Sequence, residues 1–571
     1  MRDSRARGIA RVAVVSAAAG GLAAVFTLGV FLPAFNTPHT DVEGTPREAT
    51  ELPMTPGLAR QIAFVVVDGL GYPTAKDLPE LADLRRRGVL RPLTAPLLTY
   101  TGPSITAMVT GLDPADSGVR LNGVDNGVAD LDSVTAELAK AHVPIEVAPD
   151  GFERFPRLLR APADARLLSG PVAFVAALIE RRLGLDPPGD PIDMKSPTRR
   201  FTFVHIEDVD DAGHQFGAAS QEYLGAAHHA AEHVLQIARS LDLSQDTLVV
   251  LSDHNHLPTG GHGGDEPGVD SAFLLVVGGG FVRQGVSLAQ ARPMRDVAPT
   301  LSVLAGVRAP TSSLGRPMFD LFSVDDDSLS VLFAGPFDQA ARFACALHGT
   351  PRCAEAAAIT ARLAQRDPAA RVEGEALLDD LAHARSASRD ARAAGPRRLR
   401  MLGVGFAVLA LAAGFAREAV RAARAGARPL SAAGAAAPIV YLGAYAAILG
   451  FAFDYRVTFS TMKPTLLFIR EAFLAAGASA LLVVALAVVA RLGSRAPGWL
   501  VGAVAAPFAL VAAWVGWSPA YVVTPTLGAL VFLLAPAIPG AALAAIAVAL
   551  VEAWRARGAP ESALSTSAEN R

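Results

Sequence analysis

Acidic and histidine side chains at several points of the chain, together with one threonine, are residue types that bind and use metal ions. The set comprises Asp68, Thr101, Asp210, His214, Asp253, His254 and His262. Carboxylate oxygens and imidazole nitrogens of this kind suit zinc or a similar transition metal. A hydroxyl bound to such a metal loses its proton more easily and becomes a nucleophile. The set therefore predicts two metal ions around one reactive threonine.

Apolar runs that resemble strands precede three of these acids. Residues 62–322 alternate short apolar runs with helical patterns, which predicts an α/β fold with a mostly parallel sheet sandwiched by helices. The predicted strands cover residues 62–67, 201–206, 247–251 and 272–277, and a predicted helix covers residues 221–241. Asp68, Asp210 and Asp253 fall just after such runs. Ligands of open α/β sheets bind at this carboxyl edge, so we expect the three carboxylates to meet there.

The composition indicates a membrane part beside the α/β part. The chain has 571 residues, too many for one ordinary domain, and 51% of them are hydrophobic. The excess lies after about Leu399, where apolar stretches long enough to cross a bilayer recur. The formal net charge is −3, so nothing argues for nucleic acid as a partner. The Arg-rich stretches are typical of membrane flanks.

The predicted C-terminal spans form a helical bundle. They lie near residues 399–416, 432–453, 472–490, 498–517 and 522–551. Arginines follow the first, third and last spans, whereas the intervening turns carry little positive charge, residues 397–400 being an exception. The positive-inside rule then places the α/β domain outside an inner (cell) membrane and both termini inside. Pro536 and Pro539 interrupt the last stretch, which leaves a kinked helix and a short re-entrant pair open.

The N-terminus is basic and is followed by an apolar segment over residues 12–32. A cleaved signal peptide and an uncleaved signal anchor both fit, and the missing small-x-small site before Pro33 favours the anchor. The predicted order is an anchor (1–33), a linker (34–60), a catalytic domain (61–325), a stalk (326–398), a multi-span region (399–555) and a cytoplasmic tail (556–571). The stalk has helical spacing, and a disordered linker is the alternative there.

Cys345 and Cys353 are the two cysteines of the chain and lie in the part predicted to be exported. An oxidising compartment favours a disulfide that closes this small loop. Two free thiols are the alternative. Their spacing matches no metal-binding pattern.

Taken in order, the motifs resemble the alkaline phosphatase superfamily, in its type I phosphodiesterase/nucleotide pyrophosphatase branch. They are also similar to ethanolamine-phosphate transferases that act on glycolipids. The matching blocks are Val67-Asp-Gly69, Thr101-Gly-Pro-Ser through Val109-Thr-Gly-Leu-Asp-Pro114, Asp210-x-x-Gly-His214, Ser252-Asp-His254 and Gly261-His-Gly-Gly-Asp265. Each block alone is a weak signal, and their joint order is a strong one. They cover roughly residues 60–320 and leave the membrane part unexplained.

The resemblance implies two divalent metal ions, most simply zinc. One would be held by Asp68, Thr101, Asp253 and His254, and the other by Asp210, His214 and His262. Thr101 would attack phosphorus and form a phosphothreonine, later released to water or to another alcohol. Pro103 suits the first turn of a helix, where backbone N–H groups favour an anion. Asn122 stands where this branch keeps an amide donor to the phosphoryl oxygen, although its surroundings are also typical of a turn.

Some positions depart from related patterns. Thr101 and Ile105 replace the Cys/Ser and the Arg of the sulfatase pattern Cys/Ser-x-Pro-x-Arg, so sulfatase activity is not expected. The family's usual Asp-His-Gly-Met becomes Asp253-His-Asn-His256. The aromatic residues that bind nucleotides in nucleotide pyrophosphatases are not evident. These departures leave the shape of the substrate open.

The sequence thus predicts a membrane-anchored, extracytoplasmic phosphodiesterase or phospho-alcohol transferase. A lipid or envelope substrate is expected, since tethering raises the local concentration of such substrates. A phosphomonoesterase is the first alternative, and Arg120 is its nearest candidate for holding the additional phosphate charge. An inactive membrane scaffold is the second, although no predicted ligand is missing.

Further polar residues carry weaker signals. A solvated helix face is expected for His228, His229 and His233. Supporting or substrate-contacting roles at most are expected for His205, His256 and Glu266.

Overall fold

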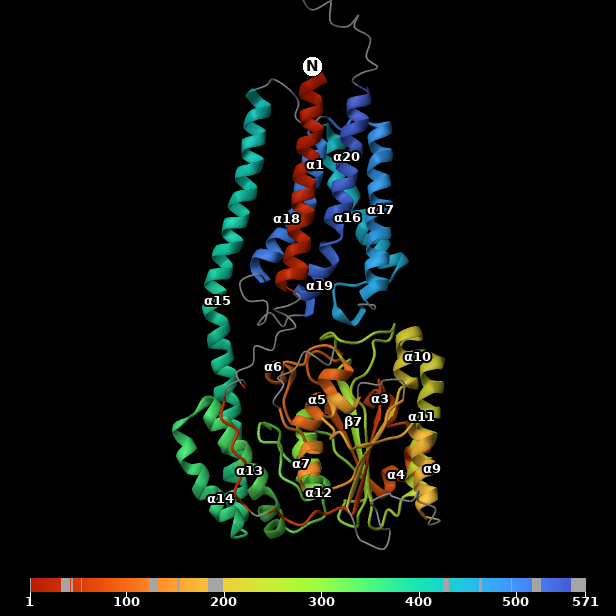
Figure 1. The fold of residues 1–571 in the computed structure, drawn as a ribbon, viewed down its shortest axis with the longest axis vertical. Coiled ribbons are helices and arrows are strands. Elements are labelled where there is room, and N and C mark those ends of the chain that lie inside the picture. Colours follow the sequence, from red (N-terminus) through yellow and green to blue (C-terminus); the bar gives the residue numbers. More distant parts are fainter. Residues whose placement is uncertain are drawn as a thin grey trace, which may run out of the picture. The chain divides into compact units, whose positions relative to one another are not determined.

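The computed structural model describes residues 2–31, 42, 45–52, 54–122, 131–150, 155–182, 199–424, 431–461, 465–493, 495–515 and 525–555. The chain divides into two compact units. Residues 36–391 form one, here called the α/β unit, and residues 1–35 and 392–571 form the other, here called the helical unit. Figure 1 shows the two sets of elements.

A nine-stranded sheet forms the centre of the α/β unit, in the order β4-β3-β5-β1-β6-β7-β2-β8, with β9 paired to β2. The strands are β1 (Gln61–Val67), β2 (Gly88–Thr94), β3 (Ile145–Ala148), β4 (Arg166–Leu167), β5 (Arg200–Ile206), β6 (Thr247–Leu251), β7 (Ser271–Gly278), β8 (Val286–Ser287) and β9 (Arg292–Pro293). β1 pairs in parallel with β5 and β6, whereas β7 runs antiparallel to β6 and β2. The predicted mostly parallel sheet is confirmed.

Both faces of the central strands are buried, which explains their continuous apolar runs. Successive side chains of a strand point to opposite faces. Phe64 and Val66 of β1 therefore lie in one apolar cluster, and Val65 and Val67 lie in the other.

Helices cover the two faces of the sheet (Figure 1). The first cluster also contains residues of α5 (Thr101–Thr110), α7 (Val134–Lys140), α8 (Phe155–Leu158) and α12 (Val297–Ala305). The second contains residues of α3 (Tyr72–Ala75), α4 (Ala82–Arg87), α9 (Gly170–Arg182) and α11 (Gln221–Ser240). The helix predicted over 221–241 is α11. Short α6 (Pro114–Ser117) and α10 (Asp208–Phe216) lie in loops that follow α5 and β5.

Three helices follow the last strands: α13 (Asp326–His348), α14 (Ala356–Ala364) and α15 (Pro368–Arg424). Phe333 and Phe337 of α13, Leu363 of α14 and Leu377 of α15 are buried in the first cluster. These residues were expected to belong to a separate stalk. The compact unit runs to residue 391, and the domain boundaries stay predictions.

The helical unit holds α1 (Arg2–Ala24), α16 (Ala432–Ala447), α17 (Thr465–Val489), α18 (Ala496–Val515), α19 (Pro525–Leu534) and α20 (Ala537–Arg555). Among the described residues, five helices are long and apolar enough to cross a membrane, over Val12–Phe31, Ala432–Ala452, Leu467–Val489, Ala496–Val515 and Ala529–Arg555. The span predicted over 399–416 lies within α15, where many side chains are outside the description. A turn at Ala535 and Pro536 breaks the last stretch.

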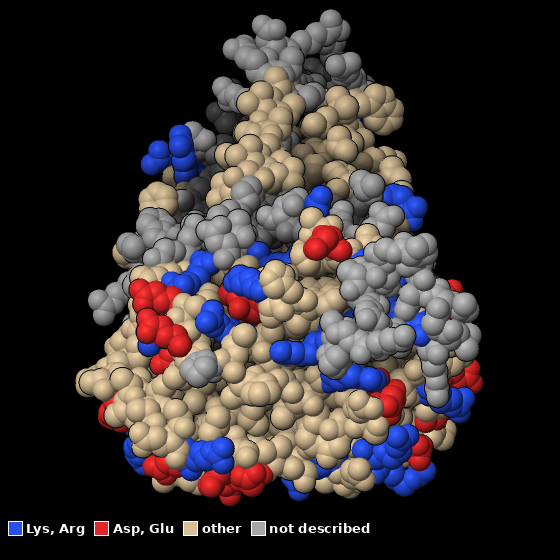
Figure 2. All heavy atoms as spheres, turned by 60° about the horizontal axis from the view of Figure 1, so that its bottom comes forward, with Lys and Arg blue, Asp and Glu red and all other residues tan. Residues whose placement is uncertain are grey.

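Charged side chains of both signs are interspersed on the face of the molecule drawn in Figure 2. In the α/β unit, charged side chains form local pairs such as Arg86 with Asp83 and Arg371 with Asp326. Exposed pairs of this kind contribute little to stability. On this face, neither sign gathers into one large patch.

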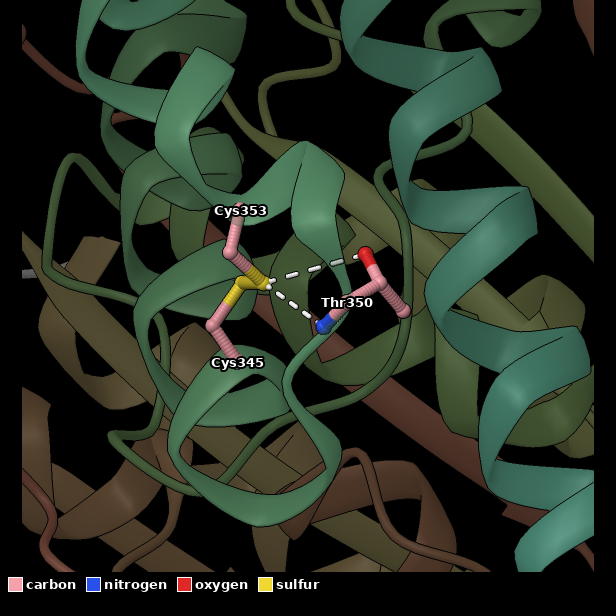
Figure 3. The surroundings of a disulfide bond; sticks show 3 residues. All are labelled: Cys345, Thr350 and Cys353. Carbon is pink, nitrogen blue, oxygen red and sulfur yellow. Dashed lines mark hydrogen bonds between the residues drawn. A yellow bond between two sulfur atoms is a disulfide. The ribbon is translucent and has the colours of Figure 1, made fainter.

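Cys345, in α13, is bonded to Cys353, in the 3₁₀ turn Pro351–Glu355 (Figure 3). The N–H of Thr350 donates to the Sγ of Cys353 over 3.4 Å. Both cysteines pack against the first apolar cluster. The disulfide therefore ties the end of α13 to the segment that leads into α14.

We predict that replacing both cysteines by Ala lowers the free energy of unfolding of the oxidised protein. For a loop of 8 residues' separation the chain-entropy estimate is about 2.5 kcal/mol. Chemical denaturation of the full chain in detergent, with and without reductant, measures the loss. Reductant should destabilise the wild type and leave the double variant unchanged, and equal stability of the two oxidised proteins would contradict the prediction.

Candidate metal centre and nucleophile

The acids of the site lie where parallel strands end. Asp68 directly follows β1, and Asp253 lies two residues after the last member of β6, with Ser252 between them. The N–H of Gly69 donates to Asp253 Oδ1 over 3.0 Å, so the loop after β1 holds the second carboxylate. Gly69 has φ of +70°, a conformation that other residues rarely adopt, and a side chain there would also meet His256. The predicted meeting of carboxylates at this edge is present in the structure.

The first group of facing side chains is Asp68, Asp253 and His254. His254 Nε2 lies 3.2 Å from Asp253 Oδ2 and 3.3 Å from Asp68 Oδ1. All three atoms are buried and have no hydrogen-bond partner within the described residues. Burial raises the pKa of Asp253 to about 7, and burial with repulsion from Asp253 and Asp210 raises that of Asp68. A cation between these atoms would satisfy all of them, so the residues fit a metal ion.

The second group surrounds Asp210. Its Oδ1 lies 2.8 Å from His256 Nε2 and 3.4 Å from His262 Nε2, and its Oδ2 lies 3.4 Å from His214 Nε2. The Nε2 atoms of His214 and His262 are 3.1 Å apart. His254 Nε2 approaches Asp210 Oδ1 to 3.9 Å, which joins the two groups. Nitrogen and oxygen atoms at these spacings fit a second cation.

The backbone orients His262 for such a role. Its Nδ1–H donates to the carbonyl of Thr99 over 2.6 Å, which leaves the lone pair of Nε2 facing Asp210. The hydroxyl of Thr99 accepts from the N–H of Gly263 over 2.8 Å and so fixes the His262 loop. Burial lowers the pKa of His262 to about 3, so the imidazole is neutral and free to bind a metal.

Thr101 is the first residue of α5, and its hydroxyl points at Asp68 Oδ2 over 3.4 Å. The helix begins there as its sequence predicts, with Pro103 in the first turn. Asn122 lies beside it, since the N–H of Gly102 donates to Asn122 Oδ1 over 2.8 Å. The amide nitrogen of Asn122 is thereby the atom left to donate. A side chain at Gly102 would meet the carbonyl of Leu121 at 2.9 Å, so this approach requires glycine.

The structure brings together all seven residues predicted to bind metal, and it places Asn122 next to Thr101. Their roles as ligands, nucleophile and donor stay predictions. His228 pairs with Glu80, and His229 pairs with Asp208, both on the outer part of α11. His229 and His233 form a third group with Asp208, and this group is largely exposed.

Further residues surround the site, and two of them, His205 and Tyr223, make hydrogen bonds to it. His205 in β5 donates through Nδ1 to the carbonyl of Asp150 and places Nε2 2.8 Å from Asp68 Oδ2. Tyr223 accepts from the N–H of Gly71 and donates to the carbonyl of Gly69, which clamps the loop after β1. Burial and neighbouring acids, Asp211 foremost, raise the pKa of Glu207 to about 7. No sequence motif marked Tyr223, because it lies on the apolar face of a helix and reads as an ordinary core residue.

Comparison with known proteins finds a family match within the α/β unit. Residues 62–139 and 155–268 match the family described as type I phosphodiesterase/nucleotide pyrophosphatase. The resemblance predicted from the motifs is therefore confirmed for this part of the chain.

Two curated relatives are GPI ethanolamine phosphate transferases. The chain is 29% identical over 136 residues to GPI ethanolamine phosphate transferase 3 of Eremothecium gossypii, which covers 22% of this chain and 13% of that protein. It is 30% identical over 147 residues to the catalytic subunit of human GPI ethanolamine phosphate transferase 3, which covers 25% and 13%. The chain thus matches only a small part of the length of these relatives.

Solved structures with a similar arrangement include human ectonucleotide pyrophosphatase/phosphodiesterase 5, at 15% identity and a TM-score of 0.37, covering 46% of this chain and all of that one. The murine protein, inactive and in complex with AMP, has 14% identity and a TM-score of 0.36, covering 47% and all of that chain.

We predict that metal affinity rises with pH up to about 7. The folded-state pKa of Asp253 is raised to about 7, so below that pH its carboxyl holds a proton that a metal ion must displace. The proton on Asp253 should contribute a gain of up to about tenfold per pH unit from pH 5 to 7, and the raised pKa of Asp68 adds to that gain. Zinc titrations of the metal-free full chain against a competing chelator measure this slope.

The control for that slope is Asp246, a buried acid whose pKa is also raised by burial but which pairs with Arg60 away from the site. Asp246→Asn should leave the slope unchanged, whereas Asp253→Asn should reduce it and weaken binding. A slope that Asp253→Asn leaves as steep as in the wild type would contradict the assignment of this proton to Asp253.

Proposed function

We propose that the protein is a membrane-bound, metal-dependent phosphodiesterase or phospho-alcohol transferase that acts through Thr101. One observation carries the proposal: the Thr101 hydroxyl, at the N-terminus of a buried helix, faces the carboxylate of Asp68 inside a cluster of acids and histidines. The match to the phosphodiesterase family over residues 62–139 and 155–268 supports it.

The residues divide the chemistry among them. Asp68, Thr101, Asp253 and His254 would hold one divalent ion, and Asp210, His214 and His262 the other; zinc suits both sets. Such ions lower the pKa of a bound hydroxyl and neutralise phosphoryl charge. The Thr101 oxygen would then attack phosphorus as its O–H bond breaks. The bond to the leaving alcohol breaks, the leaving oxygen ends with the proton that Thr101 lost, and a phosphothreonine remains. Water or a second alcohol would then attack that phosphorus, the bond from phosphorus to the Thr101 oxygen breaks, and the proton of the attacking hydroxyl restores the threonine.

The local backbone stabilises the negative charge of this reaction. Thr101 opens α5, where unpaired N–H groups and the helix dipole favour an anion. The Asn122 amide, fixed by the N–H of Gly102, directs its NH₂ group as a neutral donor to a phosphoryl oxygen. Because these donors are held before substrate binds, they need little reorganisation during the reaction.

The substrate we infer is a phosphodiester of a lipid or of an envelope glycan. Five helices long and apolar enough to cross a membrane support a multi-pass protein. The curated relatives are named as GPI ethanolamine phosphate transferases. Their names support a phospho-alcohol donor and a membrane-borne acceptor. The disulfide supports an extracytoplasmic position of the α/β unit at the cell membrane.

We predict that the full chain in detergent with zinc hydrolyses bis-p-nitrophenyl phosphate faster than p-nitrophenyl phosphate. Thr101→Ala should lower the diesterase rate by about a thousandfold or more, because the nucleophile is lost. Thr101→Ser keeps the hydroxyl and should retain part of the rate. Chelator should abolish turnover, and added zinc should restore it.

Preference for the monoester would replace this proposal with a phosphatase. Zinc-dependent turnover that Thr101→Ala leaves intact would exclude Thr101 as the nucleophile. If neither compound is turned over, incubation with a phosphatidylethanolamine donor and alcohol acceptors tests a dedicated transferase, and the absence of transfer as well would leave the scaffold reading.

A further inference from the structure

We propose that His256 is an additional nitrogen ligand of the metal ion that Asp210, His214 and His262 would hold. The proposal deepens the proposed function and rests on its two-metal centre. It concerns a residue that the sequence motifs place outside the ligand set, since the related pattern Asp-His-Gly-Met has a methionine at this position.

The position of the His256 ring is that of a ligand. Its Nε2 lies 2.8 Å from Asp210 Oδ1, the shortest contact of any imidazole with this carboxylate. Ligand atoms of Asp210, His254, His256 and His262 all lie within 4.8 Å of one another. Four ligands about 2.0–2.1 Å from a tetrahedral zinc ion lie about 3.3 Å apart. The contacts around Asp210 fall on either side of that spacing.

A hydrogen bond alone accounts for less of the geometry. The side chain of His256 is fully buried, and its Nδ1 has no hydrogen-bond partner within the described residues. An Nε2–H donor to Asp210 would explain this one contact. It would not explain why His262 Nε2 and His254 Nε2 approach the same oxygen to 3.4 and 3.9 Å. A cation among these atoms explains all three approaches together.

The backbone gives the ring little room to leave this position. A side chain at Gly213 would come within 2.3 Å of His256 Cδ2, and one at Gly69 within 2.9 Å of its Nε2, so the imidazole fills a slot between two glycines. The preceding Asn255 is also fixed. Its N–H donates to the carbonyl of Val269, and its Nδ2 donates to that of Gly268. Both sides of the slot are therefore set before any ion binds.

The chemical consequence is a richer ligand set on one side of the centre. With His256, four protein side chains would hold the Asp210 ion, the number typical of tightly held zinc. A substrate oxygen would then add to these four or displace one of them. The more exposed His214, with 49% of its side chain accessible, is the ligand best placed to yield.

The test measures zinc affinity rather than turnover. Wild type, His256→Gln and His256→Met are prepared as full chains in detergent, stripped of metal and titrated with zinc against chelators of graded strength. His256→Gln keeps a side-chain N–H able to donate to Asp210, whereas His256→Met supplies the thioether of the related pattern. His228→Gln is the matched control, because that histidine pairs with Glu80 away from the centre.

The expected result is that wild type and His228→Gln bind two zinc ions tightly, and that His256→Gln weakens one of them by more than about 100-fold. The absorption spectrum of the cobalt-loaded protein should change in both His256 variants, since the ligand field loses a nitrogen. Thermal unfolding without metal checks that the variants fold.

Two results would overturn the inference separately from the proposed function. If His256→Gln binds both ions within about tenfold of wild type and keeps its cobalt spectrum, His256 only positions Asp210 through a hydrogen bond. If wild type holds no metal, the two-metal centre fails, and the role of His256 fails with it. If a His256 variant is unfolded without metal, Gly213→Ala takes its place. The added methyl group should displace the His256 ring, and the cobalt spectrum of Gly213→Ala should then change.

Discussion

Negative charge buried at the ends of β1 and β6 is the constraint on which the rest of the α/β unit depends. Asp68 is 3% exposed and Asp253 is fully buried. Two like charges 4 Å apart repel by roughly 4 kcal/mol even at an effective dielectric constant of 20. Without a cation, burial and repulsion from neighbouring acids raise the pKa of both carboxyls. A metal ion removes that conflict, so the arrangement favours metal binding and a charged, reactive site at the same time.

Glycines and backbone hydrogen bonds keep these buried side chains close together. Gly69 turns the chain after β1, and its N–H donates a hydrogen bond to Asp253. The hydroxyl of Tyr223 in α11 donates to the carbonyl of Gly69 and fixes the same loop. Gly213 leaves room for an imidazole against α10. None of these groups has a chemical role in the proposed reaction, but each fixes a side chain of the proposed metal centre. Preorganisation of this kind is what lets buried polar groups act without first rearranging.

The sequence was sufficient to predict the positions of site residues that follow a recognisable local pattern. Asp68 and Asp253 follow strand-like runs, and parallel pairing of β1 and β6 brings them together, as the pattern predicts. The contact of His256 with Asp210 could not be predicted in this way. It depends on how closely the loop after β6 approaches α10, which Gly213 decides. The hydrogen bonds of Tyr223 could not be predicted for a similar reason. An apolar helix face does not show which backbone groups a hydroxyl will contact.

The same limit applies to the helices after residue 325. Their amphipathic spacing predicts helices, but it does not show the surface that receives them. Phe333, Phe337 and Leu363 are buried in the cluster that also covers β1, so the segment expected to be a stalk belongs, in its first part, to the core. Amphipathic periodicity establishes that a face is buried, and the partner is set by the whole fold.

The break in the last apolar stretch follows from backbone chemistry. Pro536 has no N–H and its ring obstructs the preceding turn, so α19 ends at Leu534 and α20 begins at Ala537. In an apolar environment the carbonyls near such a break need donors. Tyr445 donates to the carbonyl of Leu533 over 2.9 Å, and Tyr441 donates to that of Ala537 over 2.8 Å. Two buried hydroxyls of α16 thus bond to the backbone on either side of the break and hold α19 and α20 against α16.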